Sequence, residues 1–222
     1  FVFAGIALTF SYIIKRRSQP ASLSLGFASI CLGMWILAES DIRSLLLDLP
    51  VIWVYIAYAS IQLTPVGFYS FINQIFEIKN KLLFKFMRLL CIIYTPITFL
   101  LDFTGILSLM HSIKLFHIIL IFTMVIVLSE IILLSKKGNY NAQVFFIGFS
   151  ILSACGLYDI IDRFYIKIPL FRGHHLTQWA MFIFILTLFY ILERIIQGKS
   201  KLKMRPSLKT KGCWIMPWNM TG

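Results

Sequence analysis

Residues 113–137 read IKLFHIILIFTMVIVLSEIILLSKK, an apolar run of bilayer length that ends in two lysines. A helix needs about 20 predominantly apolar residues to cross the hydrocarbon core, where no water can satisfy an open backbone. Six further apolar segments surround this run, so the sequence predicts an all-α membrane bundle of seven transmembrane helices. We expect these helices at residues 1–14, 22–38, 51–76, 84–103, 113–135, 142–161 and 176–197.

Composition agrees with membrane insertion, because 59% of the residues are hydrophobic and only 14% are charged. The first segment is too short to span a bilayer alone. The chain also opens on Phe1 rather than methionine. We therefore expect the natural N-terminus to lie upstream of this sequence.

Positive charge falls almost entirely on one side of the expected bundle. Sixteen of the 21 lysines and arginines lie near the ends of the first, third, fifth and seventh segments. They are Lys15, Arg16, Arg17, Lys79, Lys81, Lys85, Arg88, Lys136, Lys137, Arg194, Lys199, Lys201, Lys203, Arg205, Lys209 and Lys211. Because Lys and Arg near span ends stay in the cytoplasm, we expect the N-terminus outside and the C-terminus inside.

The opposite, outer face is expected to hold most of the acidic residues. Six of the nine lie there: Glu39, Asp41, Asp48, Asp102, Asp159 and Asp162. The basic residues on that face are Arg43, Lys114, Arg163, Lys167 and Arg172. The net charge of +12 therefore needs no nucleic-acid partner, since a basic cytoplasmic tail beside anionic lipid gains about 1 kcal/mol per charge.

No motif of an enzyme or a cofactor site occurs in the sequence. It lacks GxSxG, HExxH and a Walker loop, and segment 176–197 has no lysine that could bind retinal. Cys31, Cys91 and Cys155 fall inside expected spans and Cys213 in the tail, without a CxxC pair. We therefore expect no disulfide framework, no zinc site and no cofactor.

Few polar side chains fall inside the expected spans, where they are costly. Glu130 lies about one turn from a cytoplasmic end, and it is interpreted as a snorkelling or locally paired carboxylate or as a proton or ion site. Asp102 ends a span at the outer surface, where we expect it to be solvated. Pro65 and Pro96 should kink their helices, either for packing or as hinges.

The segment YDIIDRFYIKIPLFRGHH, residues 158–175, carries the richest polar pattern of the outer face. It suggests a metal or small-ligand site or, alternatively, a polar rim with a local ion pair. With the acid that ends the second segment, the candidate outer-rim sensing residues are Glu39, Asp159, Asp162, Arg163, His174 and His175.

A family resemblance rests on SLGFASICLGMWILAESD, residues 24–41, and on WVYIAYASIQLTPVGFYSFINQIF, residues 53–76. With the basic residues after the first helix, these stretches resemble the seven-transmembrane receptors with diverse intracellular signalling modules. The closest kind precedes diguanylate cyclase (GGDEF) domains in Gram-positive bacteria, and a related region precedes some histidine kinases. The resemblance covers about residues 5–200.

The resemblance implies a sensor in the bacterial cell membrane that binds an unknown small ligand and drives a cytoplasmic effector. Effector cyclases of this family work in pairs, which implies a homodimer through segment 176–197 and the linker after it. Leu192, Ile195 and Ile196 would begin the dimer seam, with ordinary lipid-facing or bundle-facing surface as the alternative.

The tail, residues 198–222, departs from the family pattern. No acid follows Arg194, and we expect Pro206 and Pro217 to end the helix, although the family continues as a charged linker helix. The codons of GCWIMPWNMTG, read from each third base, give residues similar to an LDxALEYD stretch that leads into GGDEF domains. We expect a frameshifted remnant of a diguanylate cyclase here, and this chain itself to lack the enzyme.

The predicted function is thus a signalling input module. A small seven-helix transporter or channel is the alternative, supported only by Glu130 and by the Cys, Thr and Ser residues of segments 113–135 and 142–161. A lipid-modifying membrane enzyme would need acidic or His clusters on the cytoplasmic face, which the sequence lacks.

Overall fold

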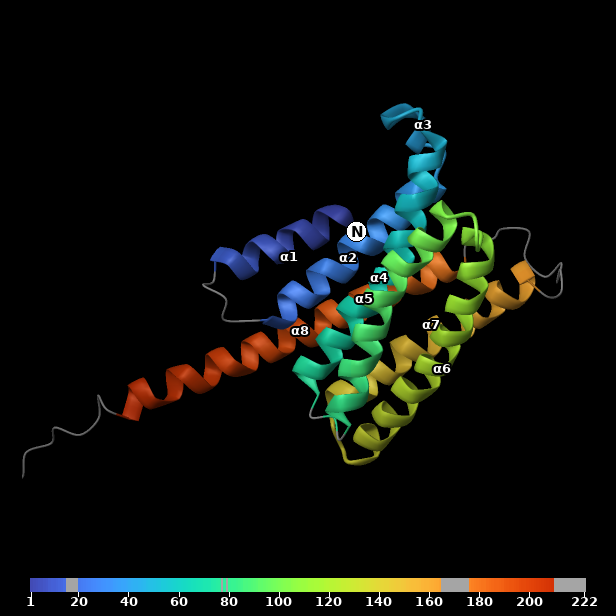
Figure 1. Ribbon diagram of the computed structural model, residues 1–222. Coiled ribbons are helices and arrows are strands. Elements are labelled where there is room, and N and C mark those ends of the chain that lie inside the picture. The colour runs from blue at the N-terminus through green and yellow to red at the C-terminus, as the bar shows by residue number, and fades with distance from the viewer. Residues whose placement is uncertain (15–19, 77, 79, 165–175, 210–222) are drawn as a thin grey trace, which may run out of the picture.

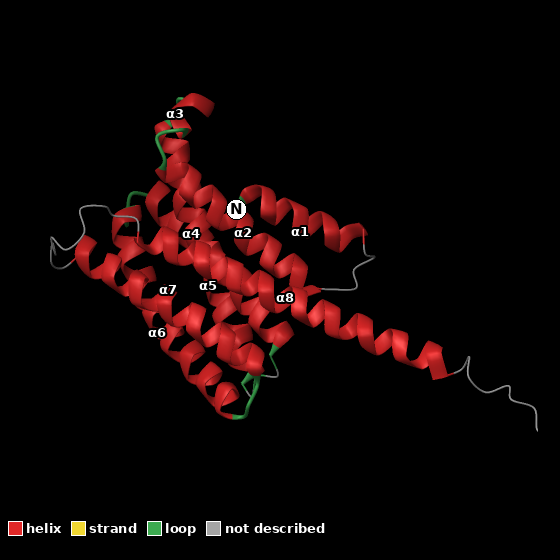
Figure 2. Ribbon diagram, turned by 180° about the vertical axis from the view of Figure 1, so that it is seen from behind, coloured by secondary structure: helices red, strands yellow, loops and turns green. Residues whose placement is uncertain are grey.

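The computed structural model describes residues 1–14, 20–76, 78, 80–164 and 176–209, and these contain helices but no strand (Figures 1 and 2). The predicted all-α fold is therefore confirmed. The helices are α1 (Val2–Ile14), α2 (Pro20–Glu39), α3 (Arg43–Leu46), α4 (Pro50–Ile75), α5 (Lys81–Phe103), α6 (Leu109–Lys136), α7 (Tyr140–Phe164) and α8 (Leu176–Lys209).

Six of the described helices, α2 and α4 to α8, are long and apolar enough to cross a membrane. The apolar helix α1 has 13 residues, so in this part of the chain it is too short to span alone. Each expected segment corresponds to one of these seven helices. The four-residue helix α3, between α2 and α4, was not predicted, because it has no apolar period of its own.

The prediction that the last helix ends at residue 197 and that Pro206 stops it is wrong. The backbone stays helical to Lys209. A proline removes one hydrogen-bond donor, but only one turn follows Pro206, and outside the membrane water can hydrate the freed carbonyl. The 34 residues of α8 extend for about 51 Å, well beyond a hydrocarbon core of about 30 Å.

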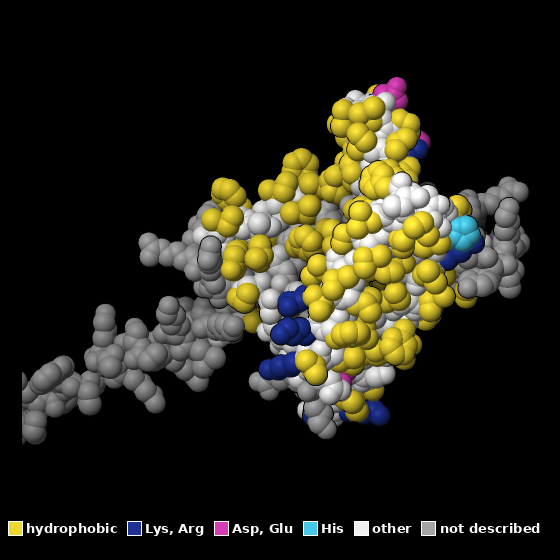
Figure 3. Space-filling view, in the orientation of Figure 1, with side chains coloured by type: hydrophobic (Ala, Val, Ile, Leu, Met, Phe, Trp, Pro, Cys, Tyr) yellow, Lys and Arg dark blue, Asp and Glu magenta, His cyan; other side chains and the backbone are white. Residues whose placement is uncertain are grey.

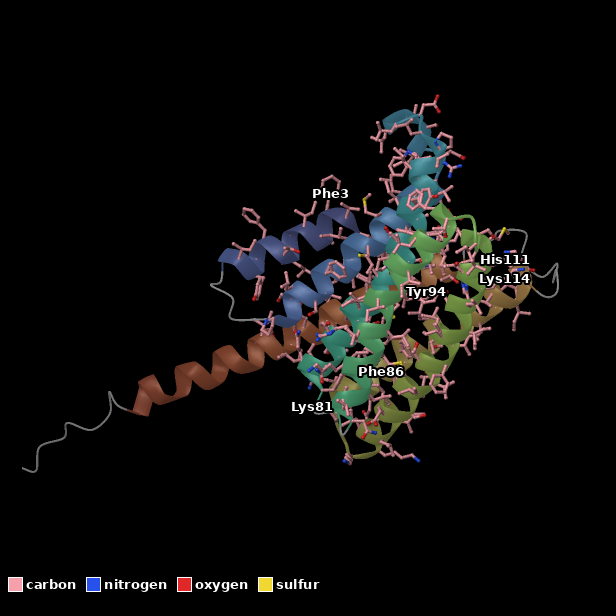
Figure 4. The ribbon with its side chains drawn as sticks, viewed as in Figure 1. Phe3, Lys81, Phe86, Tyr94, His111 and Lys114 are labelled. Atoms are coloured by element: carbon pink, nitrogen blue, oxygen red, sulfur yellow. The ribbon has the colours of Figure 1, made fainter. Side chains whose placement is uncertain are left out.

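The described basic residues follow the predicted separation of charge. In Figure 1 the end of α6 and the start of α5 lie at the lower end of the bundle, and the far end of α8 extends to the lower left. Figure 3 shows Lys and Arg side chains gathered where α5 begins. Figure 4 places Lys81 at this end of the bundle and His111 and Lys114 at the other. Seven expected charges, Lys15, Arg16, Arg17, Lys79, Lys167, Arg172 and Lys211, lie outside the described residues.

The bundle consists of two groups of helices. Helices α1, α2, α4 and α5 pack in succession and form the N-terminal group, while α6, α7 and α8 form the C-terminal group. Contact between the groups is sparser and involves α2 with α8 and α6 with α4 and α5. The seam between the groups is therefore the interface of the bundle with the least packing.

Glycine allows the closest approach within the N-terminal group. A Cβ atom at Gly67 of α4 would lie 2.8 Å from the backbone oxygen of Ser24 and 2.9 Å from the backbone nitrogen of Ala28, both on α2. Without a side chain at Gly67 the two backbones come into direct contact, which is a common basis of helix association in membranes.

Aromatic rings join the two groups of helices. The ring of Phe184 on α8 lies 5.3 Å from that of Phe68 on α4, 5.4 Å from Phe145 and 5.6 Å from Phe149, both on α7. Such pairs add about 0.5–1.5 kcal/mol each beyond the apolar area that they bury. Phe184 is fully buried and therefore connects α8 to both groups.

Candidate functional site

A partly open chamber of about 270 Å³ lies between α2, α4, α6, α7 and α8. This volume is near the lower end of the range of small-molecule sites, about 300–1,000 Å³. Its helices come from both groups, so the chamber occupies the seam between them. Apolar side chains form most of its wall, including Leu32, Ile61, Ile113, Leu152, Ile160 and Met181.

The chamber extends from the outer ends of the helices deep into the bundle. On α6 its lining runs from Met110 to Val127, which corresponds to about 25 Å of helix. On α4 it runs from Ala57 to Ile72, near the inner end of that helix. The chamber therefore crosses most of the hydrocarbon thickness of about 30 Å.

Three of the predicted outer-rim residues line the outer part of this chamber. Glu39 is the last residue of α2, and Asp159 and Asp162 lie in the last two turns of α7. Thr177 and Gln178, in the first turn of α8, line the same part. The sensing role of the three carboxylates stays a prediction. The side chain of Arg163, and both His174 and His175, lie outside what the structure describes.

Asp159 also connects α7 to the start of α8. Its Oδ2 atom accepts a hydrogen bond of 2.8 Å from the backbone N–H of Thr177, and the Thr177 hydroxyl donates to the carbonyl oxygen of Cys155 at 3.5 Å. A carboxylate at a helix N-terminus stabilises the unpaired N–H groups and the helix dipole. The outer part of the chamber is therefore attached directly to α8.

The expectation that Asp102 is only solvated is wrong. Its Oδ2 atom accepts a 2.6 Å hydrogen bond from the hydroxyl of Tyr55 on α4, and its Oδ1 atom accepts one of 3.0 Å from the backbone N–H of Leu109. Leu109 is the first residue of α6, whose N-cap residue Ser108 makes no side-chain capping bond. Asp102 therefore caps α6 from α5 and joins three helices at their outer ends.

Glu130 is a buried carboxylate with a local partner. Its Oε1 atom accepts a 2.8 Å hydrogen bond from the side-chain amide of Asn80, and only 9% of the residue is exposed. This contact joins the start of α5 to the inner part of α6. The geometry favours the locally paired interpretation of Glu130, with Asn80 as a partner that the sequence did not suggest.

Pro65 and Pro96 both lie inside helices that continue past them, α4 and α5. Pro65 is buried and lines the chamber, while Pro96 does not belong to the lining. Packing and hinge roles therefore both stay open, and Pro65 is the proline in a position to sense an occupant.

A polar pair that the sequence analysis missed lies between α4 and α5. Gln62 is fully buried, and its Oε1 atom accepts a hydrogen bond of 3.3 Å from the hydroxyl of Thr98. A glutamine within an apolar span is the signal that could have identified it, because intramembrane polar groups need partners.

The inner part of α8 packs on its own bundle. Leu192 is buried in the core, and Ile195 and Ile196 pack against it. The Arg194 guanidinium lies 4.0 Å from the ring centroid of Tyr140, at the start of α7. The three apolar side chains thus contact their own bundle, and a dimer seam at these positions stays a prediction.

Within the part of the chain that the structure describes, no three His, Cys, Asp or Glu side chains come together as metal ligands.

Neither a curated protein nor a solved structure matches the chain. A family model described as 7TM diverse intracellular signalling matches residues 1–194, which covers all of the helices above except residues 195–209 of α8. The seven-helix pattern, the apolar surface and this match lead to one conclusion: the chain belongs to the 7TM diverse intracellular signalling family.

Proposed function

We propose that this chain is the input module of a membrane receptor in which occupancy of the chamber displaces α8 and so controls a cytoplasmic effector. Membership of the signalling family supports the role of a membrane sensor. One observation supports the relay: α8 lines the chamber with its first turns and continues as a single helix to Lys209.

The contacts of α8 suit a relay. At its outer end Thr177, Gln178, Met181 and Phe184 all line the chamber, so an occupant would touch this helix. Farther inward Leu192 belongs to the core. A displacement at the chamber would therefore reach the cytoplasmic part of α8 through a continuous helix, and shifts of about 1–2 Å are typical of such switches.

The seam between the two groups of helices is where the bundle could adopt a second arrangement, which the relay requires. A ligand shifts an equilibrium only by binding its two states with different affinity. An occupant of the chamber contacts both groups across their sparsest interface, where rearrangement breaks the fewest contacts. Movement of the C-terminal group would carry α8 with it, because α7 and α8 pack closely together.

In this proposal the parent protein is a diguanylate cyclase of a bacterial plasma membrane that works as a homodimer, and the present chain carries no catalytic step. The support is the family resemblance and the alternative reading of the last codons. The test is the nucleotide sequence for about 600 bases beyond the codon of Gly222. A GGDEF or GGEEF frame offset from the present one is expected, and a stop codon with no effector in any frame would refute this part.

A variant that fills the chamber tests the relay without any ligand. Gly156 of α7 lines the chamber, and a Cβ atom there would meet only the end of Met124, at 3.8 Å. In Gly156→Phe the new ring should therefore act as an occupant. The readout is the distance between spin labels at positions 137 and 197, in a cysteine-free background in lipid nanodiscs.

We expect this distance to change by about 1–2 Å or more in Gly156→Phe. The matched control is Ala154→Phe, which adds the same ring two residues away on an exposed part of α7 and should leave the distance unchanged. Equal distances in the two variants and the unmutated chain would show that chamber occupancy does not reach the end of α8.

The transporter alternative requires a path through the inner third of the membrane. The chamber lining reaches Val127 on α6, and one turn farther inward Ile131 is fully buried in the core together with Phe145 and Ile191. Among the described residues these apolar side chains fill this inner layer, and the buried Glu130 beside them is hydrogen-bonded to Asn80. The filled core at this level therefore favours a sensor over a transporter.

A further inference from the structure

We infer that the start of α5 binds the headgroup of an anionic phospholipid from the leaflet at that end of the bundle, with an acyl chain of the lipid along the adjacent apolar edge of the helix. The inference goes beyond the proposed function and does not depend on the relay. Three features of α5 carry it: a row of basic residues, a neighbouring row of exposed apolar residues, and the depth of the basic row in the membrane.

The basic row follows one edge of α5. Lys81, Lys85 and Arg88 are spaced by four and three residues, and residues at these spacings are neighbours on the surface of a helix. Figure 3 shows Lys and Arg side chains one above another where α5 begins, and Figure 4 places Lys81 there. The Nη1 atom of Arg88 donates a hydrogen bond of 3.4 Å to the hydroxyl of Ser70 on α4, which holds the guanidinium near the start of the helix.

An apolar row runs beside the basic row. Its four side chains are between 47% and 79% exposed, and they are Leu82, Phe86, Leu89 and Ile93. The first three of them line an open groove together with Lys81 and Lys85. Exposed apolar side chains of a membrane-spanning helix contact acyl chains. A lipid whose headgroup lies at the basic row can therefore place a chain in this groove.

The positive charge at the start of α5 exceeds the acids around it. Residues 77–88 contain one acid, Glu77, and four basic residues: Lys79, Lys81, Lys85 and Arg88. The carboxylate that contacts this end from α6 is Glu130, which accepts its hydrogen bond from Asn80. Even with both acids counted against one basic residue each, two positive charges remain. Glu193 lies on α8, which packs on α7 and α2.

The depth of the basic row makes a counter-ion necessary. A span of about 20 residues, counted from Asp102 at the other end of α5, reaches Leu83. Lys85 and Arg88 therefore fall within the span, and Arg88 lies about 7.5 Å inside its limit. Charged side chains at such depth are costly unless they are paired or extend toward the headgroups. A lipid phosphate lies where these long side chains can reach it.

Charge and depth together select the class of partner. Phosphatidylcholine also has a phosphate, but its choline cancels the negative charge, whereas phosphatidylglycerol leaves one negative charge to match the excess at α5. A soluble acidic peptide would have to reach the depth of Arg88, where its backbone would lose water without replacement. An anionic phospholipid meets both conditions.

Fluorescence quenching in nanodiscs measures this lipid preference. The reporter is a bimane group on Ile93→Cys in a cysteine-free background, because position 93 ends the apolar row about 12 Å beyond Lys85. The nanodiscs consist of phosphatidylcholine with the same small fraction of either phosphatidylglycerol or phosphatidylcholine that carries a doxyl quencher in the middle of one chain. We expect the quenching to correspond to an enrichment of phosphatidylglycerol of at least about threefold beside the reporter.

Two pairs of lysine substitutions distinguish a site from diffuse attraction. Lys81→Gln with Lys85→Gln removes two charges from the basic row and should abolish the enrichment. The matched control, Lys136→Gln with Lys137→Gln, removes the same charge from the end of α6 and should retain most of it. All four lysines are exposed, and the midpoint of thermal unfolding verifies that each variant is folded.

The inference is overturned if the two quencher lipids act equally, which would leave the basic row to a soluble partner. It is also overturned if both pairs of substitutions lower the enrichment by the same factor, since a basic surface without a site would do so. The readout is lipid contact at α5, whereas the distance between positions 137 and 197 tests the relay. A failure of either measurement therefore leaves the other conclusion intact.

Discussion

Replacement of Gly67 by alanine tests the close packing of α2 and α4 most directly. The added methyl carbon would lie 2.7 Å from the Cβ atom of Ala28 and 2.8 Å from the backbone oxygen of Ser24, where ordinary contact begins at 3.4 Å. Two of the three nearest atoms belong to the backbone of α2, so no side-chain rotation relieves the clash. The helices must separate by about 0.6 Å, and overpacking of this kind costs about 1–3 kcal/mol.

Gly156→Ala is the matched control, because it makes the same change inside α7 where the new carbon meets only the end of Met124, at 3.8 Å. Both variants gain up to about 1 kcal/mol of helix propensity, so their difference isolates the packing cost. At about 2–4 °C per kcal/mol for a chain of this size, Gly67→Ala should unfold at least about 2 °C below Gly156→Ala.

The chain carries its own reporters for this measurement. Cys31 and Cys91 are buried, so after accessible thiols are blocked, a thiol-reactive dye reports unfolding in detergent. Equal midpoints, or a higher midpoint for Gly67→Ala, would show that α2 and α4 do not approach as closely as described here, and the reasoning from Gly67 would fail.

Two further predictions concern hydrogen bonds at or beside the seam between the two groups of helices. Tyr55→Phe removes one donor to Asp102 and should lower the free energy of unfolding by about 1 kcal/mol. Asp102→Ala also removes the cap of α6, so in the dye assay it should lower the free energy of unfolding further. Equal effects of the two substitutions would contradict the capping role. Asn80→Ala should destabilise the protein, and its effect should shrink in a Glu130→Ala background by about 0.5–1.7 kcal/mol. Additive effects of these two substitutions would show that the 2.8 Å contact contributes nothing.

Hydropathy predicted where the chain meets lipid but not where the backbone stops being helical. Segment 22–38 became α2, Pro20–Glu39, and segment 142–161 became α7, Tyr140–Phe164, because each apolar run is long and the bilayer demands a helix for it. The part of α8 after residue 198 is polar and contains Pro206, so its composition resembled a tail. Helix geometry there depends on backbone hydrogen bonding, which a hydropathy pattern does not report.

The site was predictable residue by residue but not as an arrangement. Glu39, Asp159 and Asp162 were each visible as acids near outer span ends, yet nothing in the sequence relates α2 to α7 across the chamber that all three line. Asp102 was misread for the same reason. An acid at a span end is hydrated by default, and its donor Tyr55 lies 47 residues earlier in the chain.

The polar contacts across the seam indicate which side of the bundle would move in the proposed relay and which side would stay fixed. Three of them lie along the edge where α6 meets the N-terminal group: Asp102 with the backbone N–H of Leu109, Tyr94 with the Ser112 carbonyl at 2.6 Å, and Asn80 with Glu130. They occur at the outer and the inner ends of this edge, so they restrain α6 along its length. On the α8 side, the contact between the groups is apolar and aromatic, as in the Phe68–Phe184 pair.

Hydrogen bonds have fixed partners and lengths, whereas apolar contacts are non-directional and can slide. The α5–α6 edge should therefore act as the hinge, and the α8 side should open or close when the chamber fills. A hinge on the opposite side would leave α8 nearly still. The placement of the polar contacts thus explains why the helix that leaves the membrane is also the one that would move farthest.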